Sequence, residues 1–143
     1  MPSIEYSVDI AAPPDRVWDA VADVEHWPNI MSHFTAVELQ SEGPLHLGSK
    51  ARVRPKGFFG SLWVVTVYGE GRSFVWESDL APGMHFVAGH TVTAVDEGAR
   101  LALSLKYSGP LATLLSPVLG RAFQRNVRQE GDAIKSYCER TSS

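Results

Sequence analysis

The chain has 143 residues, 44% of them hydrophobic and 20% charged, which suits one folded domain over residues 1–143 and excludes a disordered chain. Its net charge of −3 gives no general attraction to nucleic acid, and a single cysteine, Cys138, excludes an intrachain disulfide. No apolar run approaches the roughly 20 residues of a membrane-spanning helix, and the first residues lack a secretory signal pattern. We therefore expect a cytoplasmic protein without a transmembrane segment.

The chain opens with a strand followed by helices. Residues 4–10 alternate between apolar and polar side chains, which predicts a strand. The next segment, "AAPPDRVWDAVADV", has apolar residues at helical spacing and a proline at its expected first helical position. Residues 25–31 predict a second short helix or a turn, because Pro28 disfavours a helical Trp27.

Six further strands are predicted before the last helix. They alternate or are rich in β-branched residues, at 34–41, 49–55, 61–68, 73–79, 84–95 and 99–107. The gaps between them are short and contain glycine or proline. Such connections are typical of an antiparallel meander.

The C-terminal part predicts one long helix. Ser116 suits an N-cap and Pro117 the first helical position, and an apolar stripe then continues to about Glu139. The fold class is therefore α+β, with a curved antiparallel sheet of seven strands around a C-terminal helix. Because a helix is only about 10 Å across, we expect a strongly curved sheet to leave unfilled space beside it.

His90 lies in a predicted hairpin formed by 84–95 and 99–107. A tip at Glu97-Gly98 pairs His90 with Leu105 and Val92 with Leu103, and places His90 on the apolar face. A three-residue loop would instead turn His90 outward. The even loops are preferred because they bring more apolar residues onto the leucine side.

The order of elements resembles a known family. The segments that carry the resemblance are "VDIAAPPDRVWDAVADVEHWPNI", "GSK", "FVWES", "GHTVTAVDEGARLAL" and "RQEGDAIKSYCE", which together span nearly the whole chain. They are similar to the SRPBCC superfamily of START-like, helix-grip proteins, including the bacterial polyketide cyclase/dehydrase and lipid-transport group. The resemblance implies a helix-grip fold with a tunnel for hydrophobic molecules between the sheet and the long helix. Pro117 and Gly131 depart from the family's pattern and predict a looser last helix.

Candidate ligand-binding residues are the apolar and aromatic side chains predicted to face this space. They are Trp63, Val65, Phe74, Trp76, Phe86, His90, Val92, Leu103, Leu105, Tyr107, Leu119, Phe123 and Val127. His90 and Tyr107 are the candidates for catalysis or for polar contacts with a ligand. Each is equally compatible with a buried side chain that bonds only within the protein. Glu130 shares the helix stripe, and an edge position paired with arginine is the preferred interpretation of it.

A portal is predicted where alternate connections of the meander meet at one end of the sheet. Its candidate residues are Phe58, Phe59, Leu80, Leu111, Leu114 and Leu115. Apolar clusters of this kind mark binding sites, although the same residues could simply pack together as a plug.

Two basic faces are also present, one with Lys50, Arg52 and Arg54, the other with Arg121, Arg125 and Arg128. They are compatible with acidic lipid or RNA, and a solvated surface is the ordinary interpretation.

Three functions remain open. The first is a binding module for a lipid or a polyketide-like aromatic molecule, acting as a monomer or a homodimer. The second is a polyketide cyclase-like enzyme that uses His90 or Tyr107. The third is an interaction protein that docks through the portal. No hydrolase, zinc, Walker or dinucleotide motif is found, so neither a metal nor a cofactor is expected, and nucleic acid is not a predicted partner.

Overall fold

The computed structural model describes residues 3–56 and 60–141. Within them seven strands and three α-helices follow the predicted order. The elements are β1 (Ser3–Ile10), α1 (Pro14–Ala22), a 3₁₀ turn (Val24–His26), α2 (Trp27–Ile30), β2 (Phe34–Leu39), β3 (Lys50–Pro55), β4 (Ser61–Gly69), β5 (Ser73–Ala81), β6 (Met84–Val95), β7 (Gly98–Ser108) and α3 (Pro110–Thr141). The predicted portal residues Phe58 and Phe59 lie outside the described residues.

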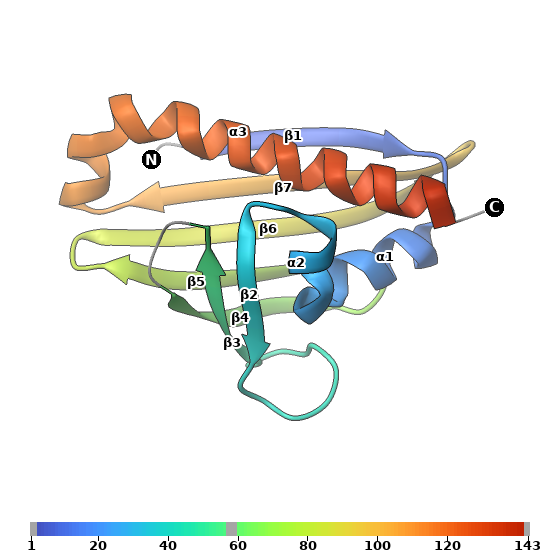
Figure 1. The fold of residues 1–143 in the computed structure, drawn as a ribbon, viewed down its shortest axis with the longest axis horizontal. Coiled ribbons are helices and arrows are strands. Elements are labelled where there is room, and N and C mark those ends of the chain that lie inside the picture. The colour runs from blue at the N-terminus through green and yellow to red at the C-terminus, as the bar shows by residue number, and fades with distance from the viewer. Residues whose placement is uncertain (1–2, 57–59, 142–143) are drawn as a thin grey trace.

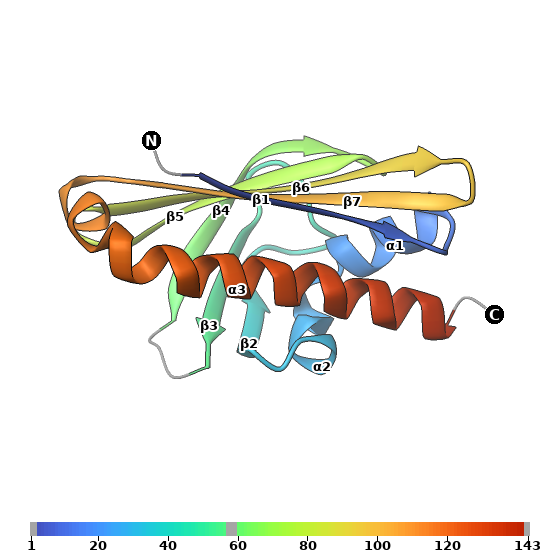
Figure 2. The same cartoon turned by 90° about the horizontal axis from the view of Figure 1, so that it is seen from above.

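The seven strands form one antiparallel sheet in the order β1-β7-β6-β5-β4-β3-β2. Figures 1 and 2 show this sheet curling so that β2 and β3 turn across the long strands, while α3 runs along the concave side. Irregular pairing between Val65 and Val67 and between Asp79 and Ala81 interrupts the ladders on both edges of β5. Bulges of this kind bend strands, which favours the curl. The fold is the predicted α+β helix grip.

Helix α1 closes one end of the concave face. Pro14 occupies its first turn, and Val17, Trp18, Ala20 and Val21 are buried against the sheet. Trp27 of α2 is also buried, and its indole donates a 3.2 Å hydrogen bond to the Val21 carbonyl. The short helices thus supply one wall of the interior beneath α3.

The pairing of β6 with β7 differs from the predicted pairing by two residues. His90 is opposite Leu103 and Val92 is opposite Leu101, so the predicted partners Leu105 and Leu103 were wrong. The turn is correspondingly shifted to precede Gly98. Because side chains alternate with a period of two, this shift keeps each residue on its predicted face. His90 is therefore buried on the concave side, as the even-loop interpretation required.

Helix α3 begins earlier than predicted. It starts at Pro110, so the predicted start at Ser116 and Pro117 was wrong and Pro117 lies inside the helix. The amides of Leu111 and Ala112 donate to the Gly83 carbonyl in the β5–β6 turn, at 3.1 and 3.3 Å. Pro117 cannot donate to the preceding turn, which explains the bend near the start of α3 in Figure 1.

Gly131 brings the middle of α3 close to the sheet. A Cβ atom at this position would lie 2.8 and 2.9 Å from ring carbons of Tyr6 on β1. Tyr6 is held there by a hydrogen bond of 2.5 Å from its hydroxyl to Asp132. Gly131 was expected to loosen the helix. Its contacts indicate instead that the missing side chain lets α3 pack closely against Tyr6.

Candidate functional site

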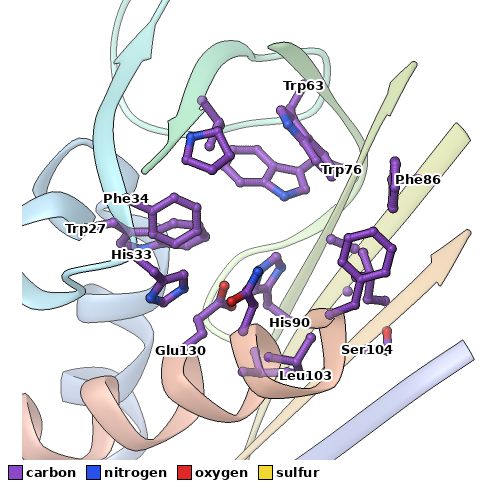
Figure 3. Close-up of a pocket in the computed structure, with 18 residues that line it drawn as sticks. Trp27, His33, Phe34, Trp63, Trp76, Phe86, His90, Leu103, Ser104 and Glu130 are labelled. Atoms are coloured by element: carbon purple, nitrogen blue, oxygen red, sulfur yellow. The ribbon is translucent and has the colours of Figure 1, made fainter. Parts of the chain in front are cut away.

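A cavity of about 170 Å³ lies between the concave face of the sheet, the α2–β2 segment and α3. Figure 3 shows side chains from all of these elements converging on it. The lining consists of Trp27, His33, Phe34, Val53, Pro55, Trp63, Trp76, Phe86, Ala88, Gly89, His90, Leu103, Ser104, Leu105, Phe123, Asn126, Val127 and Glu130. Asn126 of α3 is its most exposed member, so the cavity reaches solvent beside this helix.

The walls are mainly aromatic. Trp76 lies between Trp63 and Trp27, with ring centroids 5.7 and 5.4 Å away. Phe86 and Phe123 meet edge to face, with their centroids 5.3 Å apart, where β6 approaches α3. Such surfaces offer flat apolar contact from several directions, which suits a planar guest.

The polar end of the cavity is formed by His90. Its imidazole stacks on Phe74 with a centroid distance of 4.1 Å and an interplanar angle of 11°. The side chain is 3% exposed, with Nδ1 3.3 Å from the Phe74 carbonyl and Nε2 3.3 Å from a carboxylate oxygen of Glu130. A carbonyl only accepts hydrogen bonds, so Nδ1 carries hydrogen. The contact between Nε2 and the Glu130 carboxylate is an ion pair when His90 is protonated.

Glu130 reaches this position from α3, with a side chain that is 15% exposed. The preferred prediction that it pairs with arginine at the helix edge was wrong, since its ion-pair partner is His90. His33 also lines the cavity, and Figure 3 shows Glu130 lying between His33 and His90. Burial lowers the pKa of His33, and the negative charge of Glu130 partly opposes that effect. Two imidazoles and one carboxylate therefore gather at one end of an otherwise apolar space.

The structure brings many of the predicted ligand-binding residues to the cavity. Those in its lining are Trp63, Trp76, Phe86, His90, Leu103, Leu105, Phe123 and Val127. Val65, Phe74 and Val92 are buried in the main core without lining it. Phe74 instead stacks against the imidazole of His90, which does line the cavity.

Tyr107 and Leu119 belong to a second apolar cluster around Phe86, at the start of α3. The Tyr107 hydroxyl lies 3.1 Å from the Ser116 hydroxyl, so it already has a partner within the protein. Tyr107 does not line the cavity, and its proposed contact with a ligand stays a prediction.

Three of the predicted portal residues, Leu111, Leu114 and Leu115, have described side chains, and these lie away from the cavity lining. Leu111 packs in the second cluster, while Leu114 is 75% exposed and Leu115 is half-buried. Leu80 is in β5. Leu111, Leu114 and Leu115 do not line the cavity, so a portal at this end stays a prediction, whereas the packing of Leu111 agrees with the plug alternative.

Several lining residues were absent from the predicted ligand-binding set: Trp27, His33, Phe34, Val53, Pro55, Ala88, Gly89, Ser104, Asn126 and Glu130. Asn126 and Glu130 follow Phe123 at successive spacings of three and four residues, so the sequence alone placed them on the same face of the helix as Phe123. Trp27 and His33 carried no comparable signal, because their place depends on how α2 folds under the curled sheet.

Residues 1–139 match the family model described as "Polyketide cyclase / dehydrase and lipid transport". A Streptomyces halstedii protein, provisionally named a polyketide cyclase, is 48% identical over 40 residues. That match covers 27% of this chain and only 37% of the relative, so the chain spans well under two thirds of the relative's length.

Solved structures share the fold at low identity. A Thermus thermophilus protein has a TM-score of 0.80 at 18% identity, over 99% of this chain and 100% of that one. The Zhui aromatase/cyclase of a Streptomyces species also gives 0.80, at 20% identity over 97% and 94% of the two chains. A norcoclaurine synthase mutant from Thalictrum gives 0.75, at 15% identity over 99% and 96%. At such identities the likeness establishes the fold alone.

Proposed function

Because this chain belongs to the polyketide cyclase / dehydrase and lipid transport family, a branch of the SRPBCC superfamily, we propose that it binds one small, flat, hydrophobic molecule beside α3. The observation that carries the proposal is the aromatic cavity with a single polar end at His90 and Glu130. A ligand that buries about 200 Å² of apolar surface would gain about 5 kcal/mol before the costs of association. Binding therefore needs no catalytic group.

The size of the cavity favours a ring compound over a long acyl chain. An engineered apolar cavity of about 150 Å³ holds one benzene molecule. The cavity here is about 170 Å³, room for one ring and a small extension toward solvent beside Asn126. A hydroxyl or carbonyl on that ring would meet His90 or Glu130, while the rest of the ring contacts tryptophan and phenylalanine.

The proposal is tested by titrating the purified protein with a panel of single-ring phenols, two-ring aromatics and fatty acids, following tryptophan fluorescence. Ala88 lines the cavity, and Ala88→Phe fills it, whereas Ala94→Phe places the same ring at an exposed position of the same strand. We expect ring compounds to bind the parent protein and Ala94→Phe, with affinity at least tenfold weaker in Ala88→Phe. Equal binding by both variants would exclude this cavity as the site.

A second candidate function is cyclisation of a poly-carbonyl substrate in the same cavity. The specific observation in its favour is the 3.3 Å contact between His90 Nε2 and a carboxylate oxygen of Glu130 at the end of an apolar space. In such a reaction the pair would take a proton from carbon next to one carbonyl, and the resulting enolate would attack a second carbonyl. The pair would then return the proton to the new alkoxide, so no oxidant or net proton is needed.

Glu130→Gln separates the two functions. The amide can still donate to His90 Nε2 but cannot exchange the proton as a carboxylate does. For an enzyme we expect turnover to fall at least a hundredfold while the affinity for the ligand changes far less. Turnover equal to the parent's would remove the pair from the chemistry, whereas no turnover by the parent itself would leave the binding function alone.

A further inference from the structure

The outward face of α3 carries an unusual stripe, defined here as Leu114, Val118, Arg121, Arg125 and Arg128. Spacings of four and three residues place these side chains on one line of the helix. They lie opposite Phe123 and Val127, which line the cavity. Figure 2 shows α3 running along one side of the molecule, so this line is available over much of its length.

The apolar part of the α3 stripe is exposed at positions where a helix facing solvent normally carries polar residues. Leu114 and Val118 are each 75% exposed and occupy adjacent turns at the bent start of α3. The other exposed large hydrophobic side chains of the described residues, Leu47, Val67 and Leu62, are only 62, 51 and 41% exposed. Leu114 and Val118 therefore form one exposed apolar patch on this face of the helix.

The positive charge of the three arginines is not balanced by acidic residues nearby in the sequence. Residues 110–129 contain three arginines and no aspartate or glutamate, in a chain whose net charge is −3. Arg121, Arg125 and Arg128 are exposed, and Arg128 lies over the Tyr6 ring at 5.4 Å. Glu130, the next acidic residue, points inward to His90, and Asp132 accepts from Tyr6. Among the described residues, Arg121 and Arg125 form no ion pair.

We propose that the α3 stripe docks the protein on a membrane surface rich in anionic lipid. Arginines would meet the headgroup phosphates while Leu114 and Val118 enter the boundary with the acyl chains. Protein hot spots are enriched in Trp, Tyr and Arg, so the arginines alone fit either partner, but the same hot spots under-represent Leu and Val, which favours a bilayer for Leu114 and Val118. A convex line of aliphatic and arginine side chains is instead the pattern of a helix that lies on a bilayer.

The test is co-sedimentation with vesicles of phosphatidylcholine, with and without phosphatidylglycerol, at low ionic strength. We expect binding only when phosphatidylglycerol is present, weakening as salt is added. Arg121→Gln with Arg125→Gln should weaken it about fivefold per arginine, so about 25-fold together. Leu114→Ser with Val118→Ser should weaken binding several-fold at every salt concentration.

The matched control is Arg52→Gln with Arg54→Gln on β3, which removes the same charge from another exposed face. It should change vesicle binding less than twofold. Absence of binding to anionic vesicles overturns the proposal, as does an equal loss in the control pair. Arginine-dependent self-association without vesicle binding would assign the stripe to a second copy of the chain. Arginine-dependent retention on immobilised poly-glutamate, again without vesicle binding, would assign it to an acidic polypeptide.

Discussion

The contact between His90 and Glu130 is the best place to test the geometry of the cavity. We expect Glu130→Ala to lower the free energy of unfolding by about 1.5–2 kcal/mol, near the lower end of the range for a polar contact with a charged group. The lower end applies because the Nε2 to Oε2 distance is 3.3 Å and Glu130 keeps 15% of its side chain exposed. Water can therefore replace part of the lost interaction.

His90→Leu should cost more, about 2–4 kcal/mol, because it also removes the bond to the Phe74 carbonyl and the ring stacking. The double variant should then be more stable than the sum of the single losses predicts, by about 1–2 kcal/mol. Urea unfolding followed by circular dichroism gives all four stabilities. In thermal unfolding, Glu130→Ala should lower the midpoint by about 5 °C for a chain of this length.

The predicted contact is contradicted if the losses of unfolding free energy in the two single variants add within about 0.5 kcal/mol in the double variant. Distant and independent sites show such additivity. Such a result would mean that Glu130 does not contact His90 in solution. The polar end of the cavity would then be a histidine held by Phe74 alone.

Two further predictions concern stability. Hydrogen bonds from His85 to Asp79 and then to Glu77 raise the pKa of His85, so its contribution is complete below the ordinary histidine value of about 6.5 and is lost as pH rises through the raised value. The urea midpoint of the parent relative to His85→Gln should therefore fall as the pH is raised from about 6 through the raised pKa of His85, and a flat difference would contradict this. Gly131→Ala, whose Cβ would meet a tyrosine ring, should be less stable than Gly120→Ala by about 1–3 kcal/mol in the same assay. Equal stabilities would mean that the ring moves aside freely.

No helix within the described ranges 3–56 and 60–141 is long and apolar enough to cross a membrane. Docking through the α3 stripe is proposed as contact with a bilayer surface. It can be tested independently of ligand binding, because Arg121 and Arg125 do not line the cavity.

Local pattern was sufficient to predict the strands, their antiparallel order and the face of β6 on which His90 lies. His90 illustrates why: a two-residue error in pairing left it on the concave side, because alternation along a strand is a property of the strand itself. The same holds for Phe123 and Val127, whose helical spacing placed them on the inner face of α3.

Contacts between distant segments decided the rest. The helix begins at Pro110 because the Gly83 carbonyl, in a different turn, accepts its first amides, and no local cap signals that. Glu130 meets His90 instead of an arginine because the curled sheet brings β6 against that turn of α3. Periodicity determines which way a side chain points from its own element, whereas its partner depends on how far the sheet curls and where the helix crosses it.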